Sequence, residues 1–202
     1  MLFRSVGEHT IRSMQYIRAD KVLRLTMLLH DVEKPVCRTE DENGIHHFHG
    51  HPQVGAEMSR KILRRLKFDN DTIHRVMALV RAHDDRPPLQ GRSVRRAIYR
   101  NGTEQYPELF EVKRADILAQ SSFLQQEKLL YVDRYEHMYQ QIMEKEQCLS
   151  LKELAVNGSD LIARGIQPGK EIGEILHQML EKVLEEPELN EKEVLLAWYF
   201  KA

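Results

Sequence analysis

Hydrophobic residues recur at helical spacing along most of the chain. Val54, Met58, Ile62 and Leu66 fall on one face of a helix, and the basic residues between them fall mostly on other faces. No segment with the alternating pattern of a strand is longer than residues 45–49. The pattern predicts an all-α protein with helices over residues 6–17, 20–32, 52–66, 70–84, 92–100, 109–119, 123–145, 170–185 and 191–200.

Proline, glycine and asparagine mark the connections between these helices. Pro35 prevents the second helix from continuing, and Asn43-Gly44 predicts a tight turn in a loop or short hairpin before residue 52. Further along, residues 150–153 match a capping box at a helix start, and Asn157 begins a turn into a short helix. The change in these signals places a boundary near residue 148, which divides the chain into parts 1–147 and 148–202.

His30 and Asp31 stand side by side at the end of the second apolar helix. An aspartate there faces the negative end of the helix dipole, and its burial is costly unless a cation or hydrogen bonds compensate. A metal ion would meet both requirements. For such a pair taken alone, a hydrogen-bonded couple at a helix end is the simpler interpretation.

Further residues of types that bind metals favour a metal site over the hydrogen-bonded couple. His51 extends the apolar face of the third helix backward, and His83 follows Val80 by three residues. Asp116 lies on an apolar stripe, where an unpaired carboxylate would be expensive. With His9 in the first helix, the candidates offer only nitrogen and oxygen donors, which suit Fe, Mn, Co, Ni or Zn rather than Ca.

Composition narrows the class of protein only slightly. The chain has 202 residues, 42% of them hydrophobic and 30% charged, and its formal net charge of -1 argues against bulk affinity for nucleic acid. Cys37 and Cys148 are far apart in sequence and are expected to be reduced thiols. No apolar run approaches a membrane span, so we expect a cytoplasmic protein with no membrane partner.

The order of the candidate residues resembles that of the HD superfamily of metal-dependent phosphohydrolases, with His, then His-Asp, then His, His and Asp on successive helices. More narrowly, the run from Leu28 to His83, with Gly50-His51, is similar to the HD domain of bacterial CCA-adding tRNA nucleotidyltransferases. Residues 154–173 resemble the region that follows that domain in those enzymes. The resemblance implies an HD-domain helical bundle over 1–147 and a C-terminal helical appendage over 148–202.

The resemblance also implies one or two divalent transition metal ions. It divides the ligands between ions that share Asp31: a first held by His9, His30, Asp31 and Asp116, and a second held by Asp31, His51 and His83. The implied activity is hydrolysis of a nucleotide or RNA terminal phosphate, such as a 2′,3′-cyclic phosphate or a phosphomonoester, by attack of metal-bound hydroxide. The chain would then be an HD-type phosphohydrolase or phosphodiesterase.

Two charged residues beside the ligands are candidates for the catalytic set together with Asp31. Lys34 lies one turn beyond His30 and could stabilise phosphoryl oxygens, although a solvated loop lysine is an equal alternative. Asp84, next to His83, is a weaker candidate for proton handling or for orienting a ligand histidine. Glu33 departs from the family, in which this position is often glycine, and its role stays open.

Other polar residues have open interpretations. We expect the loop histidines 46, 47 and 49 to line the mouth of a pocket rather than bind metal, since the core ligands suffice. A basic series is either a guide for a nucleotide or RNA backbone or a solvated helix face: Arg81, Arg86, Arg92, Arg95, Arg96 and Arg100.

Polymerase activity is not expected from these residues. The chain has too few residues before His9 for a nucleotidyltransferase head, and Asp69-Asn70-Asp71 is interpreted as a helix cap. One alternative is a non-catalytic module that binds tRNA or a partner, which includes a separate nucleotidyltransferase subunit. Another is an HD-fold diiron oxygenase with the same ligands.

Overall fold

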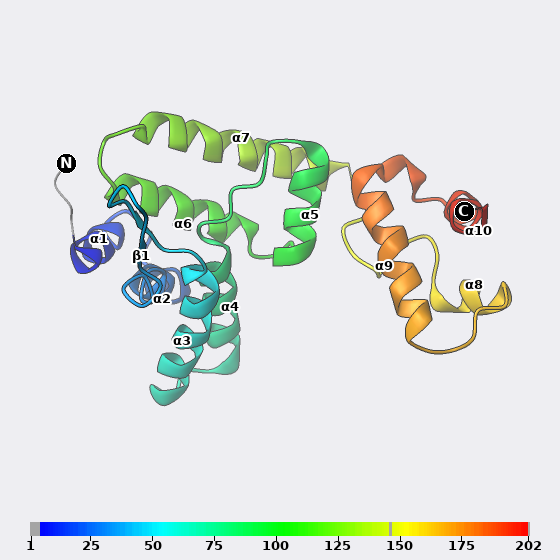
Figure 1. Cartoon of the computed structure of the whole chain (residues 1–202), viewed down its shortest axis with the longest axis horizontal. Coiled ribbons are helices and arrows are strands. Elements are labelled where there is room, and N and C mark those ends of the chain that lie inside the picture. The colour runs from blue at the N-terminus through cyan, green and yellow to red at the C-terminus, as the bar shows by residue number, and fades with distance from the viewer. Residues whose placement is uncertain (1–4, 146, 202) are drawn as a thin grey trace. The chain divides into compact units, whose positions relative to one another are not determined.

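The computed structural model describes residues 5–145 and 147–201. These residues form ten α-helices, one short 3-10 helix and one two-stranded sheet, which confirms the all-α prediction (Figure 1). The chain divides into two compact units. The first unit is Met1–Arg86 with Asn101–Arg134, and the second unit is Pro87–Arg100 with Tyr135–Ala202. These units are compact parts of the structure, whereas the boundary near residue 148 was predicted for functional domains. That boundary stays a prediction.

The first unit is a helical bundle whose core is apolar. Helices α3 and α4 lie against each other, and α2 packs on α4 and α6 (Figure 1). Leu23, Met27, Val76, Leu79 and Leu109 are completely or almost completely buried between them. The helices are α1 (Val6–Ser13), α2 (Lys21–Leu29), α3 (His51–Arg65), α4 (Asn70–Ala82), α6 (Tyr106–Ala119) and the start of α7 (Gln125–Glu144).

Side chains at the helix starts explain where two of these helices begin. The Asp20 carboxylate accepts hydrogen bonds from the backbone N–H groups of Val22 and Leu23 and so caps α2. Asp69 caps α4 by accepting from the N–H of Thr72 at 2.8 Å, which confirms the predicted cap. The cap of α4 accounts for the acidic residues at 69–71, so a catalytic pair of carboxylates is not needed to explain them.

The first two helices end earlier than predicted. After α1 the chain forms tighter turns, in which Gln15 donates to the carbonyl of Arg12 and Tyr16 to that of Ser13. After α2, His30 is the C-cap, and the N–H of Lys34 donates to the carbonyl of Asp31 at 3.0 Å. Apolar spacing continues through these turns, so it overestimates the helix length. His30 and Asp31 therefore lie at and just beyond the end of α2.

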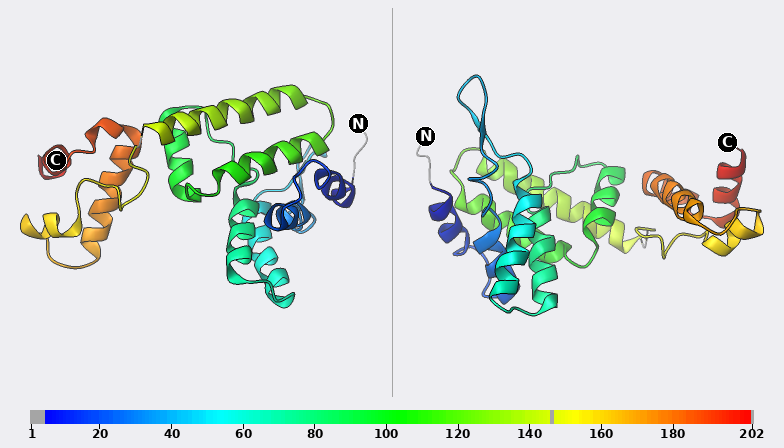
Figure 2. Two further views of the ribbon diagram at one scale, coloured as in Figure 1. Left: turned by 180° about the vertical axis from the view of Figure 1, so that it is seen from behind. Right: turned by 60° about the horizontal axis from the view of Figure 1, so that its bottom comes forward.

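The predicted hairpin is present. Strands β1 (Thr39–Glu40) and β2 (His46–His47) pair antiparallel, with Thr39 opposite His47. Gly44 occupies the turn with φ of 74°, a left-handed conformation that suits glycine. In the right-hand view of Figure 2 the hairpin projects from the helices of the first unit.

The second unit is also helical. Its helices are α5 (Gly91–Asn101), the later part of α7, α8 (Gly158–Ala163), α9 (Lys170–Glu185), the 3-10 helix η1 (Pro187–Leu189) and α10 (Lys192–Lys201). Asn157 caps α8 as predicted, by accepting from the N–H groups of Ser159 and Asp160. Residues 150–153 form an isolated turn, so the helix start predicted there is wrong; Glu153 accepts from the N–H of Leu149 instead.

Two arginines of the basic series hold the second unit together. The buried Arg95 donates to the carbonyl oxygens of Leu184 and Glu185 at 2.7 and 3.0 Å. Arg96 pairs with Glu181 at 2.8 Å. Arg95 and Arg96 therefore fasten α5 to α9, which neither of the two interpretations of the series predicted. In the described part of the chain, no helix is long and apolar enough to cross a membrane.

Candidate metal centre

The structure brings all six predicted metal ligands together in the first unit. Five elements supply them: α1, the end of α2, the first residue of α3, the C-cap of α4 and the last turn of α6. His30 and Asp31 are 0% and 1% exposed, so the cluster lies in the interior of the bundle. The residues are His9, His30, Asp31, His51, His83 and Asp116.

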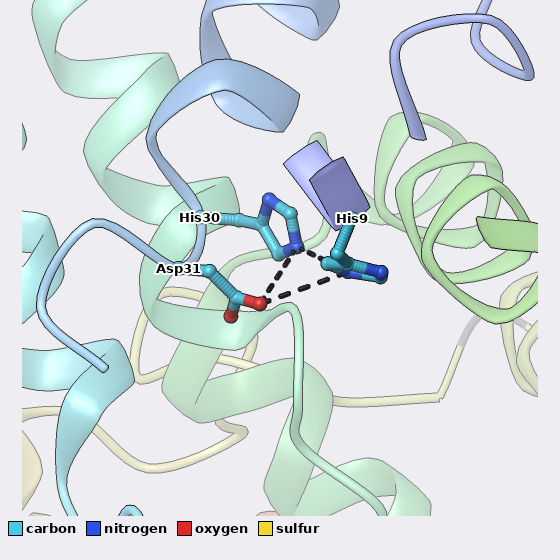
Figure 3. Close-up of side chains that lie close together, drawn as sticks. All are labelled: His9, His30 and Asp31. Atoms are coloured by element: carbon cyan, nitrogen blue, oxygen red, sulfur yellow. Dashed lines mark hydrogen bonds and ion pairs between the residues drawn. The ribbon is translucent and has the colours of Figure 1, made fainter. Parts of the chain in front are cut away.

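The first group of ligand atoms comes from α1, α2 and α6. The Nε2 atoms of His9 and His30 are 3.2 Å apart, and both face Oδ2 of Asp31, at 3.7 and 3.3 Å respectively (Figure 3). Asp116 Oδ1 lies 2.8 Å from His9 Nε2 and 3.6 Å from His30 Nε2. Two carboxylate oxygens and two imidazole nitrogens thus surround one point.

The second group meets the other oxygen of Asp31. His51 Nε2 and His83 Nε2 lie 3.5 and 3.6 Å from Asp31 Oδ1 and 3.3 Å from each other. Asp31 therefore belongs to both groups, with one carboxylate oxygen directed to each. This arrangement is suited to a carboxylate that bridges two ions.

Hydrogen bonds orient three of the imidazoles toward this point. His30, His51 and His83 each direct Nδ1 at the backbone carbonyl three residues earlier, at 2.7, 2.8 and 2.7 Å. Because a carbonyl only accepts, each Nδ1 carries the proton and donates it, which leaves Nε2 for a metal. Asp116 is held similarly, since its Oδ2 accepts from Gln120 Nε2 at 2.9 Å.

The charges in the cluster depend on one another. Burial opposes the charged form of His30, but hydrogen bonds to Asp116 and Asp31 outweigh it and raise the pKa of His30 to about 10. Burial would raise the pKa values of both carboxyls, yet the histidines around them keep both pKa values below the ordinary range. Burial lowers the pKa of His83. A proton on His30 thus lies between two carboxylates, and metal binding would displace it.

The donor set fits a divalent transition metal. Asp31 Oδ1 is buried and accepts no hydrogen bond from the described residues, although two imidazole nitrogens face it. An unsatisfied buried carboxylate oxygen is costly, and a cation coordinated there would satisfy it. Imidazole nitrogens with carboxylate oxygens suit Fe, Mn, Co, Ni or Zn.

The neighbouring candidates lie at different places. Lys34 Nζ is 2.7 Å from Asp31 Oδ2, and its side chain is 26% exposed. Lys34 therefore lies at the cluster and is not a fully solvated lysine of a loop. Asp84 has a 44% exposed side chain and pairs with Arg86 at 3.0 Å. Glu33 is buried.

The loop histidines interact within the hairpin. His46 lies near Arg38 and Glu40, at 2.7 and 3.4 Å. His47 pairs with Asp41 at 3.0 Å and stacks on His49. Within the described residues, no hydrogen bond or ion pair joins these three imidazoles to the cluster.

Sequence reasoning missed two residues that support the ligands. Gln120 lies four residues after Asp116, a helical spacing that could have indicated the contact. Lys113 is buried and donates to the carbonyls of His83 and Asp85 at 2.8 and 2.6 Å, which holds the end of α4. Burial lowers the pKa of Lys113 to about 8. No local signal identified this lysine, because its partners are about thirty residues away.

Comparisons with a family model and with known proteins agree on one family. The model of the family described as tRNA nucleotidyltransferase domain 2 matches residues 39–199. The chain is 33% identical over 180 residues to the CC-adding tRNA nucleotidyltransferase of Thermus thermophilus, across 86% of this chain and 40% of that protein. It is 31% identical over 185 residues to the A-adding tRNA nucleotidyltransferase of Deinococcus radiodurans, across 87% of this chain and 42% of that protein. The chain thus spans about two fifths of the length of these relatives.

Proposed function

Because the chain belongs to the tRNA nucleotidyltransferase domain 2 family and has a buried cluster that fits a divalent metal, we propose that it is a metal-dependent phosphohydrolase or phosphodiesterase. Its substrate would be a nucleotide or an RNA terminal phosphate, such as a 2′,3′-cyclic phosphate or a phosphomonoester. The resemblance to the HD superfamily supports this proposal.

The observation that carries the proposal is the position of Asp31. Its two oxygens face two separate groups of histidines, and Oδ1 accepts no hydrogen bond from the described residues. A hydrogen-bonded His-Asp couple would need only one of these groups. Two ligand sets that share a carboxylate are suited to a pair of ions, which is a common arrangement in phosphate chemistry.

The residues around the cluster have complementary roles in this proposal. A divalent ion bound there supplies an activated water at neutral pH and neutralises phosphate charge. His9 and Asp116 are partly exposed, at 13% and 11% for their side chains, so substrate would approach from their side. Lys34 donates to Asp31 and its side chain is partly exposed, so it is a candidate for contact with phosphoryl oxygens. We retain Asp84 as a candidate for proton handling, because its carboxylate is accessible.

A second candidate function is a non-catalytic tRNA-binding module or a partner of a separate nucleotidyltransferase subunit. The family match favours it, since residues 39–199 exclude His9, His30 and Asp31 but include nearly all of the C-terminal helices. The names of both relatives refer to tRNA. In this case the family likeness would reflect RNA contact rather than hydrolysis.

The test begins with protein purified without chelator, its metal content measured by elemental analysis, and samples loaded with Mn, Co, Ni, Fe or Zn. We expect phosphate release or ring opening from 2′,3′-cyclic nucleotides or nucleoside monophosphates. Asp31→Asn should reduce the rate by at least about a hundredfold. The matched control is Asp41→Asn, which also removes an aspartate paired with a histidine, but on the hairpin.

Two results would contradict the hydrolase. Oxygen uptake without phosphate chemistry in the iron-loaded protein would indicate an oxygenase. Unchanged tRNA affinity after metal removal, with no hydrolysis under any loading, would indicate the binding module.

A further inference from the structure

A cavity of about 320 Å³ adjoins the metal cluster within the first unit. His83 and Asp116 form part of its wall, so it reaches the ligands themselves. Another part of the wall comes from Leu124, which precedes α7, and from Lys128 and Tyr131 in the first turns of α7. A group that fills the cavity would therefore contact both α7 and the cluster.

A chain of hydrogen bonds connects a cation in this wall to a metal ligand. Lys128 Nζ donates to Gln120 Oε1 at 2.7 Å, and Gln120 Nε2 donates to Asp116 Oδ2 at 2.9 Å. Arg86 adds a second positive charge to the lining. An anionic group in the cavity would thus meet the cluster on one side and a fixed ammonium on another.

The rest of the wall is mostly apolar and aromatic, and Lys113 and Glu127 are its remaining charged residues. Leu124 is 45% exposed and Tyr131 is half-buried, and both line the cavity. The volume is near the lower end of the range for small-molecule sites, about 300 to 1,000 Å³. This combination of apolar side chains, three cations against one carboxylate outside the cluster, and limited volume suits one phosphorylated nucleoside and excludes a folded RNA from the cavity itself.

We propose, on the basis of the proposed hydrolytic function, that this cavity binds a single nucleotide unit of the substrate. The phosphate on the ribose lies between the cluster and Lys128, and the base lies against Leu124 and Tyr131. Lys128 is then a substrate-binding residue, and Gln120 positions both Lys128 and Asp116. The nucleotide comes either from a free mononucleotide or from the end of an RNA.

The test measures binding without turnover, by calorimetric titration of the metal-loaded protein with adenosine 3′-monophosphate. Lys128→Met should weaken binding about tenfold, because it removes a charged hydrogen-bond donor. Lys128→Arg should retain most of the affinity. The control is Arg134→Met, which removes an exposed cation from the same helix outside the cavity lining and should change affinity less than about twofold.

A second variant tests the apolar wall. Leu124 has a left-handed backbone with φ of 53°, which asparagine tolerates, so Leu124→Asn should fold. It should weaken binding of adenosine 3′-monophosphate about fivefold and leave binding of inorganic phosphate unchanged. Comparison of the mononucleotide with a short RNA that ends in a 3′-phosphate distinguishes the two sources, since the source that binds more tightly is the preferred one.

The outcomes separate this inference from the proposed function. Equal losses in Lys128→Met and Arg134→Met, or no loss in Lys128→Met, would overturn the nucleotide cavity even if the protein hydrolyses phosphates. An absence of wild-type binding to both the mononucleotide and the RNA would also overturn it. The expected binding pattern without hydrolysis would support the cavity and contradict the hydrolase.

Discussion

Replacing Asp31 by asparagine would test metal binding most directly, because this carboxylate belongs to both ligand groups. Asparagine keeps the shape of the side chain but has one amide nitrogen in place of an oxygen and no charge. Whichever way the amide turns, one of the two histidine groups loses its oxygen ligand, and the other keeps only an uncharged amide oxygen. The change would therefore weaken metal binding by both groups without removing side-chain volume from the core.

The size of the effect follows from linkage between binding and unfolding. A free metal concentration of about one hundred times Kd stabilises the folded protein by roughly 2.7 kcal/mol. For a chain of this length, 1 kcal/mol shifts Tm by roughly 2 to 4 °C, so the metal should raise the Tm of the wild-type protein by about 5 to 11 °C. If Asp31→Asn weakens binding about a hundredfold, stabilisation falls to about 0.4 kcal/mol, a rise in Tm of only about 1 to 2 °C.

The assay compares thermal unfolding of chelated and metal-loaded samples, together with the metal content of each variant. His51→Gln serves as an intermediate case, because His51 faces only Asp31 Oδ1 and the second group. We expect its metal content to fall from about two ions to one, while Asp31→Asn retains less than one. Asp41→Asn should behave as the wild-type protein.

Two results would refute this reasoning. If Asp31→Asn keeps the full metal-dependent rise in Tm, the carboxylate is not a ligand. If the wild-type protein shows neither bound metal nor a rise in Tm with any of the five metals, the cluster is a structural hydrogen-bond network.

Three further predictions concern single side chains. Lys67 follows the C-cap of α3 with φ of 58°, so Lys67→Gly should increase the free energy of unfolding by about 0.5 to 1 kcal/mol in urea denaturation, and a decrease would contradict the strain. Gln120→Ala should weaken metal binding about 10 to 100-fold in competition with a chromophoric chelator, because Asp116 loses its donor; unchanged affinity would show that this hydrogen bond does not matter. Asp20→Ala should lower stability by about 1 kcal/mol in thermal denaturation, because α2 loses its cap, and an unchanged Tm would refute this.

The sequence predicted the features that depend on neighbouring residues. Helix spacing gave the range of α9 to the residue, and the side chains of Asp69 and Asn157 marked helix starts. The turn at Gly44 was also predictable, because a left-handed conformation needs a special residue. These signals depend on residues close together in the sequence, so the amino-acid sequence of a single chain is enough to recognise them.

Features that depend on distant partners were not predictable in the same way. Arg95 resembles its exposed neighbours in sequence, but its carbonyl acceptors lie about ninety residues away. The Ser150 turn has the residues of a capping box, yet no helix continues from it. The ligand set was expected from apolar faces and from family resemblance, whereas the cavity beside it depends on how α7 lies against α6.

The charge of the cluster connects metal binding to the choice of substrate. Without metal, two carboxylates, those of Asp31 and Asp116, are matched by the protonated His30 and by Lys34, so the cluster is close to neutral. One divalent ion that displaces the His30 proton gives the site a net positive charge, and a second ion raises it further. A buried positive site is stabilised by an anion, and the cavity beside it adds the cations Arg86, Lys113 and Lys128 against the single carboxylate of Glu127. Under the proposed function, the cluster would therefore match the charge of a phosphate ester only when metal is bound.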